Sequence, residues 1–206
     1  MNQTLKLLIF SDVFVLTGFA LISPIMAIFI KENLIGGSIA TVGIVAAITT
    51  FVRCILQLVF AHIAKPKHRY RMAVTGTLFI AVVPFIYFFS TNVTHIYIAA
   101  LIHGFGAGLA NPAWFSLFAN NLAKGKKGFE WAIYSSSVGI GTAVAAFVGS
   151  QLASKFGFEP VFIVVGILAL IGCGILIGLS KAELKDHRIK TVTAKMKLHK
   201  PPQGLE

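Results

Sequence analysis

The stretch His103–Asn121, HGFGAGLANPAWFSLFANN, combines polar and aromatic side chains within an otherwise apolar run. At about 100° per residue, a helix through it places six side chains on one stripe: His103, Ala107, Ala110, Asn111, Trp114 and Asn121. Polar side chains at membrane depth are costly and usually face a bundle interior or a water-filled path. The stripe therefore predicts one wall of a solute pathway. The alternative is that His103 and Asn111 only bond to neighbouring helices.

Three further polar residues lie inside apolar runs. Asp12 lies about six residues, or ~9 Å, inside the first run. Arg53 lies about ten residues, or ~15 Å, from the inner end of the second run, and Gln57 follows one turn later. Because an isolated charge at that depth is costly, we expect Asp12 and Arg53 to pair. Within the runs only Asp12 and His103 could readily exchange protons, so these two are candidate proton carriers.

Motifs of enzymes and of cofactor or metal sites are absent from the sequence. It has no Gly-x-Ser-x-Gly, no His-Glu-x-x-His, no paired carboxylates and no nucleotide-binding loop. Cys54 and Cys173 show no partner pattern, so no disulfide framework is implied. We therefore expect a protein that is not an enzyme and that holds no cofactor and no metal.

Composition assigns the chain to the membrane proteins. Its 206 residues are 56% hydrophobic and 12% charged, with a mean hydropathy of +0.83. Apolar runs of membrane-spanning length predict six helices, over residues 6–30, 39–63, 72–90, 95–122, 131–153 and 160–180. Pro24 should bend the first of them. The helices that the polar residues occupy are thus membrane spans, and an all-α bundle is expected.

Lys and Arg are distributed unevenly between the two sides of this bundle. One set of loops, together with the termini, carries fifteen, among them Lys65, Arg69 and Arg71, whereas the opposite loops carry two, Lys31 and Lys155. The bias predicts that both termini are cytoplasmic, in what we expect to be a bacterial inner membrane. The net charge of +11 is spread over the loops, which favours an anionic lipid surface over nucleic acid as its partner.

An internal repeat connects the first run with the fourth. A shift of 88 residues brings six identities into register: Gly18 with Gly106, Leu21 with Leu109, Pro24 with Pro112, Asn33 with Asn121, Leu34 with Leu122, and Gly37 with Gly125. Each repeat holds three spans, so the second crosses the membrane in the opposite sense, as in many transporters. We expect one six-helix domain over residues 1–180, with repeats at about 6–90 and 95–180, and a basic cytoplasmic tail over 181–206.

These features resemble one half of a major facilitator superfamily (MFS) transporter, whose halves are built from 3+3 inverted repeats. The loop after the second span resembles the family's cytoplasmic signature. Ala61 stands at its Gly position and Lys65 at its Asp position, while Arg69 and Arg71 keep the basic part. The resemblance implies that Lys65, Arg69 and Arg71 form a cytoplasmic gate loop.

The second repeat carries the rest of the resemblance. HGFGAG resembles the family's Arg-x-x-Gln-Gly-x-Gly segment, with Ala100 at the Arg position and His103 at the Gln position. VGIGTAVAAFVG resembles the antiporter segment without its Gly-Pro pair, and FGFEPVF the Gly-aromatic stretch before the sixth helix. A half-length member would work as a parallel homodimer, with Ser135, Gly139 and Ala143 as a small-residue packing face.

The resemblance implies a secondary transporter of a small solute that works by alternating access, either coupled to protons or as a uniporter. Its pathway would use Asp12, Arg53, Gln57, His103, Asn111 and Trp114. Two other interpretations stay open: a non-transporting membrane scaffold, and one half of a twelve-helix transporter. A remote third is a channel, because Asn111-Pro112-Ala113 is the water-channel tripeptide, although that fold needs two copies.

Overall fold

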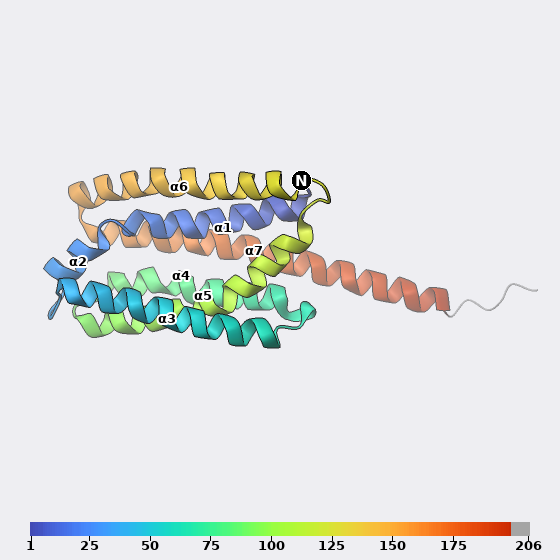
Figure 1. Ribbon diagram of the computed structural model, residues 1–206, viewed down its shortest axis with the longest axis horizontal. Helices are drawn as coiled ribbons and strands as arrows, with labels where there is room; N and C mark the ends of the chain where they lie inside the picture. The colour runs from blue at the N-terminus through green and yellow to red at the C-terminus, as the bar shows by residue number, and fades with distance from the viewer. Residues whose placement is uncertain (199–206) are drawn as a thin grey trace, which may run out of the picture.

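Six long apolar helices run along one axis in the computed structural model (Figure 1). It describes the backbone of residues 1–198 and the side chains of residues 1–181. The helices are α1 Gln3–Ile22, α2 Met26–Asn33, α3 Ile39–Ile63, α4 Arg69–Phe88, α5 Val93–Asn121, α6 Lys127–Phe156 and α7 Phe158–Leu198, with a short 3-10 turn, η1, at Pro66–His68. The predicted all-α membrane protein with six spanning helices is thus confirmed.

The first predicted span is interrupted at Pro24, which separates α1 from α2. Proline has no backbone N–H and its ring clashes with the preceding turn of a helix. The Ser23 N–H still donates a helical hydrogen bond of 3.1 Å to the Phe19 carbonyl. The Ile25 N–H, in contrast, donates to the Ile22 carbonyl, only three residues back, at 3.1 Å. The predicted bend is therefore a complete break, whereas α5 continues through Pro112.

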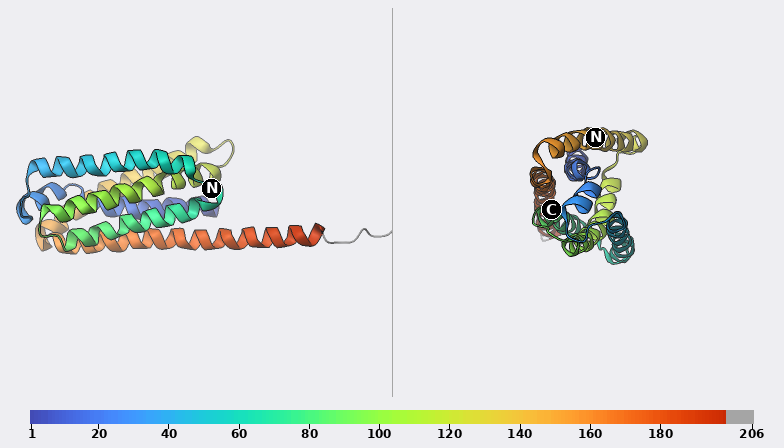
Figure 2. Two further views of the ribbon diagram at one scale, coloured as in Figure 1. Left: turned by 90° about the horizontal axis from the view of Figure 1, so that it is seen from below. Right: turned by 90° about the vertical axis from the view of Figure 1, so that its left-hand side faces the viewer.

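The spanning helices pack as an open arc. The most extensive contacts follow the order α3, α5, α4, α7, α1, α6, and α1 touches α5 only sparsely. The view along the bundle axis in Figure 2 shows α6 and α3 on opposite sides of this arrangement. In α3 and in α6, only 11% of the residues in the most apolar 18-residue segment are buried, against 44% in each of the other four spans. The two ends of the arc thus carry the most exposed helices.

The packing order is symmetric about its centre. If α1 is exchanged with α5, α3 with α6 and α4 with α7, the same order results, read from the opposite end. In this arrangement each spanning helix of one predicted repeat (α1, α3 and α4) packs mainly on helices of the other (α5, α6 and α7). The order is compatible with an internal repeat of 88 residues, and the repeat itself stays a prediction.

Glycines of α5 bring that helix close to two neighbours. A Cβ at Gly104 would lie 2.8 Å from the Thr49 carbonyl oxygen of α3, and one at Gly106 would lie 2.7 Å from the Gly76 carbonyl oxygen of α4. Backbone atoms cannot yield to a side chain there. This close approach fixes α5 between α3 and α4.

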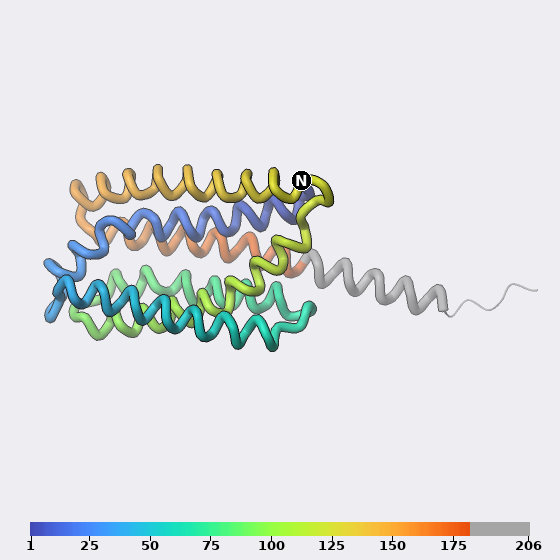
Figure 3. Tube along the Cα trace, viewed as in Figure 1, coloured from blue at the N-terminus to red at the C-terminus, as the bar shows by residue number. Residues whose placement is uncertain are grey.

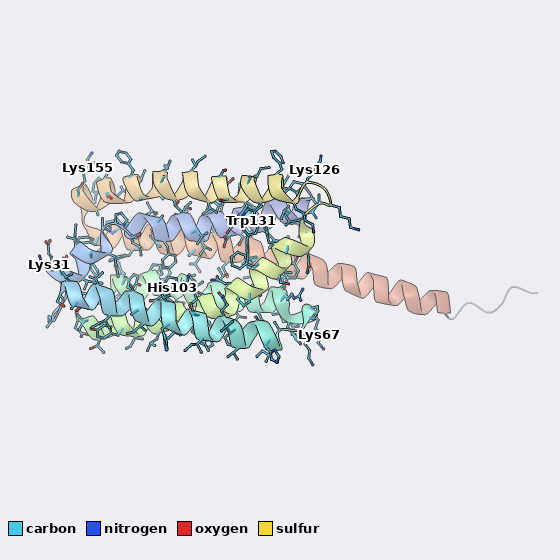
Figure 4. All side chains as sticks on the ribbon, in the orientation of Figure 1. Lys31, Lys67, His103, Lys126, Trp131 and Lys155 are labelled. Atoms are coloured by element: carbon cyan, nitrogen blue, oxygen red, sulfur yellow. The ribbon has the colours of Figure 1, made fainter. Side chains whose placement is uncertain are left out.

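Connections between the helices alternate between the two ends of the bundle, as the Cα trace shows (Figure 3). Lys31 and Lys155 lie at one end and Lys67 and Lys126 at the other (Figure 4). The structure thereby separates the two basic sets that the sequence assigns to opposite sides. Of the predicted tail over 181–206, the backbone is helical to Leu198 within α7, and residues 199–206 lie outside the described part of the chain.

Candidate functional site

A cavity of about 610 Å³ lies between the two sides of the arc. Its walls are largely apolar, and six side chains with polar atoms line it: Ser23 of the α1–α2 turn, Thr49 and Thr50 of α3, Tyr87 of α4, His103 of α5 and Thr142 of α6. A largely apolar cavity with a few polar groups is the usual form of a small-molecule site. Every spanning helix except α7 contributes to the lining, so relative movement of the helices would reshape it.

His103 is the predicted pathway residue that lines the cavity. Its ring stacks on Phe19 of α1, with the ring centroids 4.7 Å apart. The imidazole forms no hydrogen bond with the described residues, and it lies within electrostatic range of Arg53. Its two ring nitrogens are therefore available to a solute in the cavity.

A second cluster joins α1, α5 and α6 nearer the end of the bundle that carries Lys67 and Lys126. The Tyr134 hydroxyl of α6 donates a hydrogen bond of 2.6 Å to Oδ2 of Asp12 on α1. Trp114 of α5 packs on Tyr134, with the ring centroids 5.0 Å apart. The structure thus brings together Asp12 and Trp114, two of the predicted pathway residues, through a tyrosine.

Trp114 has an unusual environment within this cluster. Its side chain is 5% exposed, and its Nε1–H is buried without a hydrogen-bond partner among the described residues. Phe118 also stacks on the indole, with the ring centroids 5.0 Å apart. A buried donor without a partner costs about 1–3 kcal/mol, so a change of conformation that supplies an acceptor would be favoured.

The expected ion pair between Asp12 and Arg53 is wrong. Asp12 is bonded to Tyr134, and Arg53 forms no ion pair with any described carboxylate. The reason is the packing order: α1 lies against α6 and α7, whereas α3 lies against α5. The consecutive spans α1 and α3 are therefore not neighbours in the bundle.

The remaining pathway candidates, Gln57 and Asn111, are half-buried. Neither side chain forms a hydrogen bond within the described residues. The backbone nitrogen of Gln57 lies close to Gly108, where α3 meets α5. These two residues therefore lie outside both the cavity lining and the Asp12 cluster.

The predicted gate loop and packing face lie on the surface of the chain. Lys65 and Arg71 are exposed and Arg69 is half-buried. The three packing-face residues of α6 are all exposed: Ser135, Gly139 and Ala143. A Cβ at Gly139 would meet no atom within 4 Å, so this face is not used for packing within the chain.

Tyr134 and Glu130 are polar residues that the sequence analysis missed. Glu130 is 2% exposed, and its Oε2 accepts a hydrogen bond of 2.8 Å from the Ala123 N–H. Nearby, the Asn2 side chain donates to Oδ1 of Asn121 at 3.2 Å, linking α1 to the end of α5. The sequence does carry a signal for Glu130 and Tyr134: a carboxylate and a tyrosine lie one turn apart at the start of a helix that otherwise has mostly small residues.

Comparisons with known proteins agree on one family. The sequence profile of the Major Facilitator Superfamily matches residues 8–203. An uncharacterised MFS-type transporter of Methanocaldococcus jannaschii is 24% identical over 154 residues, which cover 75% of this chain and 39% of the relative. The in meso crystal structure of the POT family transporter PepTSo superposes with a TM-score of 0.67 at 16% identity, covering 100% of this chain and 40% of that one. The chain thus spans about two fifths of the length of these two proteins.

Proposed function

The chain belongs to the Major Facilitator Superfamily, and from this premise we propose that it moves a small solute across a membrane by alternating access. The observation that supports this most directly is the cavity of about 610 Å³, lined by His103 and four hydroxyl-bearing threonine and serine side chains. Contacts near the opposite end, Asp12 with Tyr134 and Asn2 with Asn121, join α1 to α6 and α5. A transporter of this kind opens such contacts when the cavity changes sides.

Transport is tested with the purified full chain in proteoliposomes preloaded with candidate solutes. Counterflow of a labelled solute from a panel of amines, sugars and organic acids should exceed that of empty liposomes. His103→Phe, which keeps an aromatic ring beside Phe19 but removes both ring nitrogens, should slow it. A protein that moves no solute under any gradient would favour the scaffold interpretation.

We propose further that two copies in the same orientation form the working unit. The support is the exposure of α3 and α6, which end the arc and bury only 11% of their most apolar windows. A two-fold axis along the membrane normal would place α3 of one copy against α6 of the other and enclose the cavity. The longer relatives keep the alternative of a second, non-identical half open.

The proposed orientation places both termini and the Lys65–Arg71 loop in the cytoplasm of a bacterial cell. The support is the separation of Lys67 and Lys126 from Lys31 and Lys155 by the length of the bundle (Figure 4), together with the positive-inside rule. A cysteine at position 67 or 155, in a chain without its two native cysteines, distinguishes the sides. An impermeant maleimide added to intact cells should label only position 155.

The most specific part of the proposal is that Asp12 carries the proton that is coupled to transport. Asp12 lies about nine residues, or ~14 Å, from the start of α1, and its partner is a hydroxyl rather than a cation. A carboxyl held in this way can gain or lose a proton without breaking an ion pair. In proteoliposomes with an imposed pH gradient, Asp12→Asn should still exchange solute but no longer accumulate it. Accumulation that survives this substitution would remove Asp12 from the coupling.

A further inference from the structure

Arg53 is a cation deep within a span that has no ion-pair partner among the described residues. The residue lies ten positions from Ile63 at one end of α3 and fourteen from Ile39 at the other, which is about 15 Å and 21 Å of helix. An arginine side chain cannot reach water at either end over such distances. It is half-buried and forms no ion pair with any described residue.

Arg53 continues the polar stripe of α3 that lines the cavity. Thr49 and Thr50 are lining residues, and Arg53 follows them by four and three positions, on the same side of the helix. His103, also in the lining, lies within electrostatic range of Arg53. Arg53 thus lies one turn beyond the lining residues of α3, on the side of the helix that faces the cavity.

The described part of the chain, residues 1–181, offers no counter-charge at this depth. The carboxylate side chains of residues 1–181 are Asp12, Glu32, Glu130 and Glu159. Glu32 and Glu159 belong to the ends of α2 and α7, and Glu130 is buried in the first turn of α6. Asp12 is the one described carboxylate inside a span, and it is bonded to Tyr134.

A second identical copy would not supply one either. Its α6 would face α3, and the carboxylate of that helix is Glu130, which is 2% exposed within its own chain. An uncompensated cation at membrane depth is expensive, and such residues commonly mark substrate or ion pathways. The missing anion is therefore expected to be the ligand.

We propose that the solute carried by this protein is a small oxyanion, a carboxylate or a phosphate, bound in the cavity by Arg53. The planar guanidinium donates two parallel hydrogen bonds to such a group. His103 and the hydroxyls of Thr49 and Thr50 would contact the remainder of the solute. This inference rests on the proposed transport function and adds the charge class of its substrate.

The test uses the purified full chain and measures its melting temperature in detergent at constant ionic strength. The ligands are phosphate, acetate, succinate and citrate, with chloride, methylammonium and glucose as references. At least one oxyanion should raise the melting temperature of the wild type, with saturation. A response to phosphate alone identifies a phosphorylated solute, and one to the organic acids identifies a carboxylate.

Variants then assign the response to Arg53. Arg53→Gln should weaken the apparent affinity at least tenfold, while Arg53→Lys, which keeps the charge without the fork, should weaken it less. Lys155→Gln, which removes one exposed charge far from the cavity, should retain the wild-type affinity. Without ligand, Arg53→Gln should be at least as stable as the wild type, because it removes an uncompensated charge at membrane depth. An arginine with only a structural role would show the opposite.

Three results of the melting measurements would overturn the inference: no oxyanion raises the melting temperature of the wild type, Arg53→Gln responds as the wild type does, or Arg53→Gln is destabilised without ligand. The first would leave Arg53 to pair with a carboxylate of a different chain. Uptake of methylammonium or glucose that Arg53→Gln retains would also overturn it, while transport itself stands. Saturable oxyanion binding with no uptake of any solute would instead count against the transport function alone.

Discussion

Removal of the Tyr134 hydroxyl tests the cluster that joins α1 to α6. Tyr134→Phe keeps the ring that packs on Trp114 and deletes the donor of the 2.6 Å hydrogen bond to Asp12. A hydrogen bond to a charged group contributes about 1.5–3 kcal/mol, and a short O–H···O distance is typical of such bonds. For a chain of about 200 residues, 1 kcal/mol corresponds to about 2–4 °C, so the melting temperature should fall by about 3–12 °C.

The assay is thermal unfolding of the purified protein in mild detergent, with Tyr97→Phe as the matched control. Tyr97 is half-buried in α5, and its hydroxyl forms no hydrogen bond with a described residue, so its loss should change stability by less than ~0.5 kcal/mol. Equal effects of the two substitutions would refute the assignment of the hydrogen bond as a stabilising contact.

A double-mutant cycle distinguishes the hydrogen bond between Asp12 and Tyr134 from an ion pair between Asp12 and Arg53. In an Asp12→Asn background, Tyr134→Phe should cost only about 0.5–1.5 kcal/mol, because the acceptor is then neutral. Arg53→Gln should combine additively with Asp12→Asn, since the two side chains form no ion pair. Rescue of Asp12→Asn by Arg53→Gln would restore the ion pair as the better description.

Three further predictions concern helix packing and a buried hydrogen bond. Gly139→Leu should convert a dimer to monomers in nanodisc mass measurements, while Gly174→Leu on α7, which is equally open within the chain, should leave the mass unchanged; the same mass for both variants would exclude the α6 interface. Gly76→Leu would bring a side chain within 2.5 Å of the α5 backbone and should lower stability by about 1–3 kcal/mol or more. Gly43→Leu, with no atom within 4 Å, should be tolerated in the same thermal assay. Glu130→Ala should cost about 1–3 kcal/mol, because a loop N–H loses its buried acceptor, and unchanged unfolding would show that water replaces it.

Much of the fold follows from the sequence alone. Apolar runs of span length predict the six helices because a lipid environment requires every backbone polar group to be satisfied within a helix. The predicted second span, 39–63, coincides with α3 at Ile39–Ile63. Pro24 predicts a bend in the first span through its missing N–H, and the structure has a complete break between α1 and α2 there. Such signals are local, so no knowledge of the rest of the chain is needed.

Only the tertiary structure decided which polar groups meet. Asp12 and Arg53 lie on consecutive spans, yet α1 and α3 are separated by the packing order of the arc. Tyr134 lies 122 residues from Asp12 along the chain and is bonded to it. In a membrane, helices of similar composition gain little from one neighbour over another through the hydrophobic effect, so partners are selected by shape and by polar contacts. The periodicity of a single helix gives the face on which a charge lies, but the helix opposite that face is determined by the whole bundle.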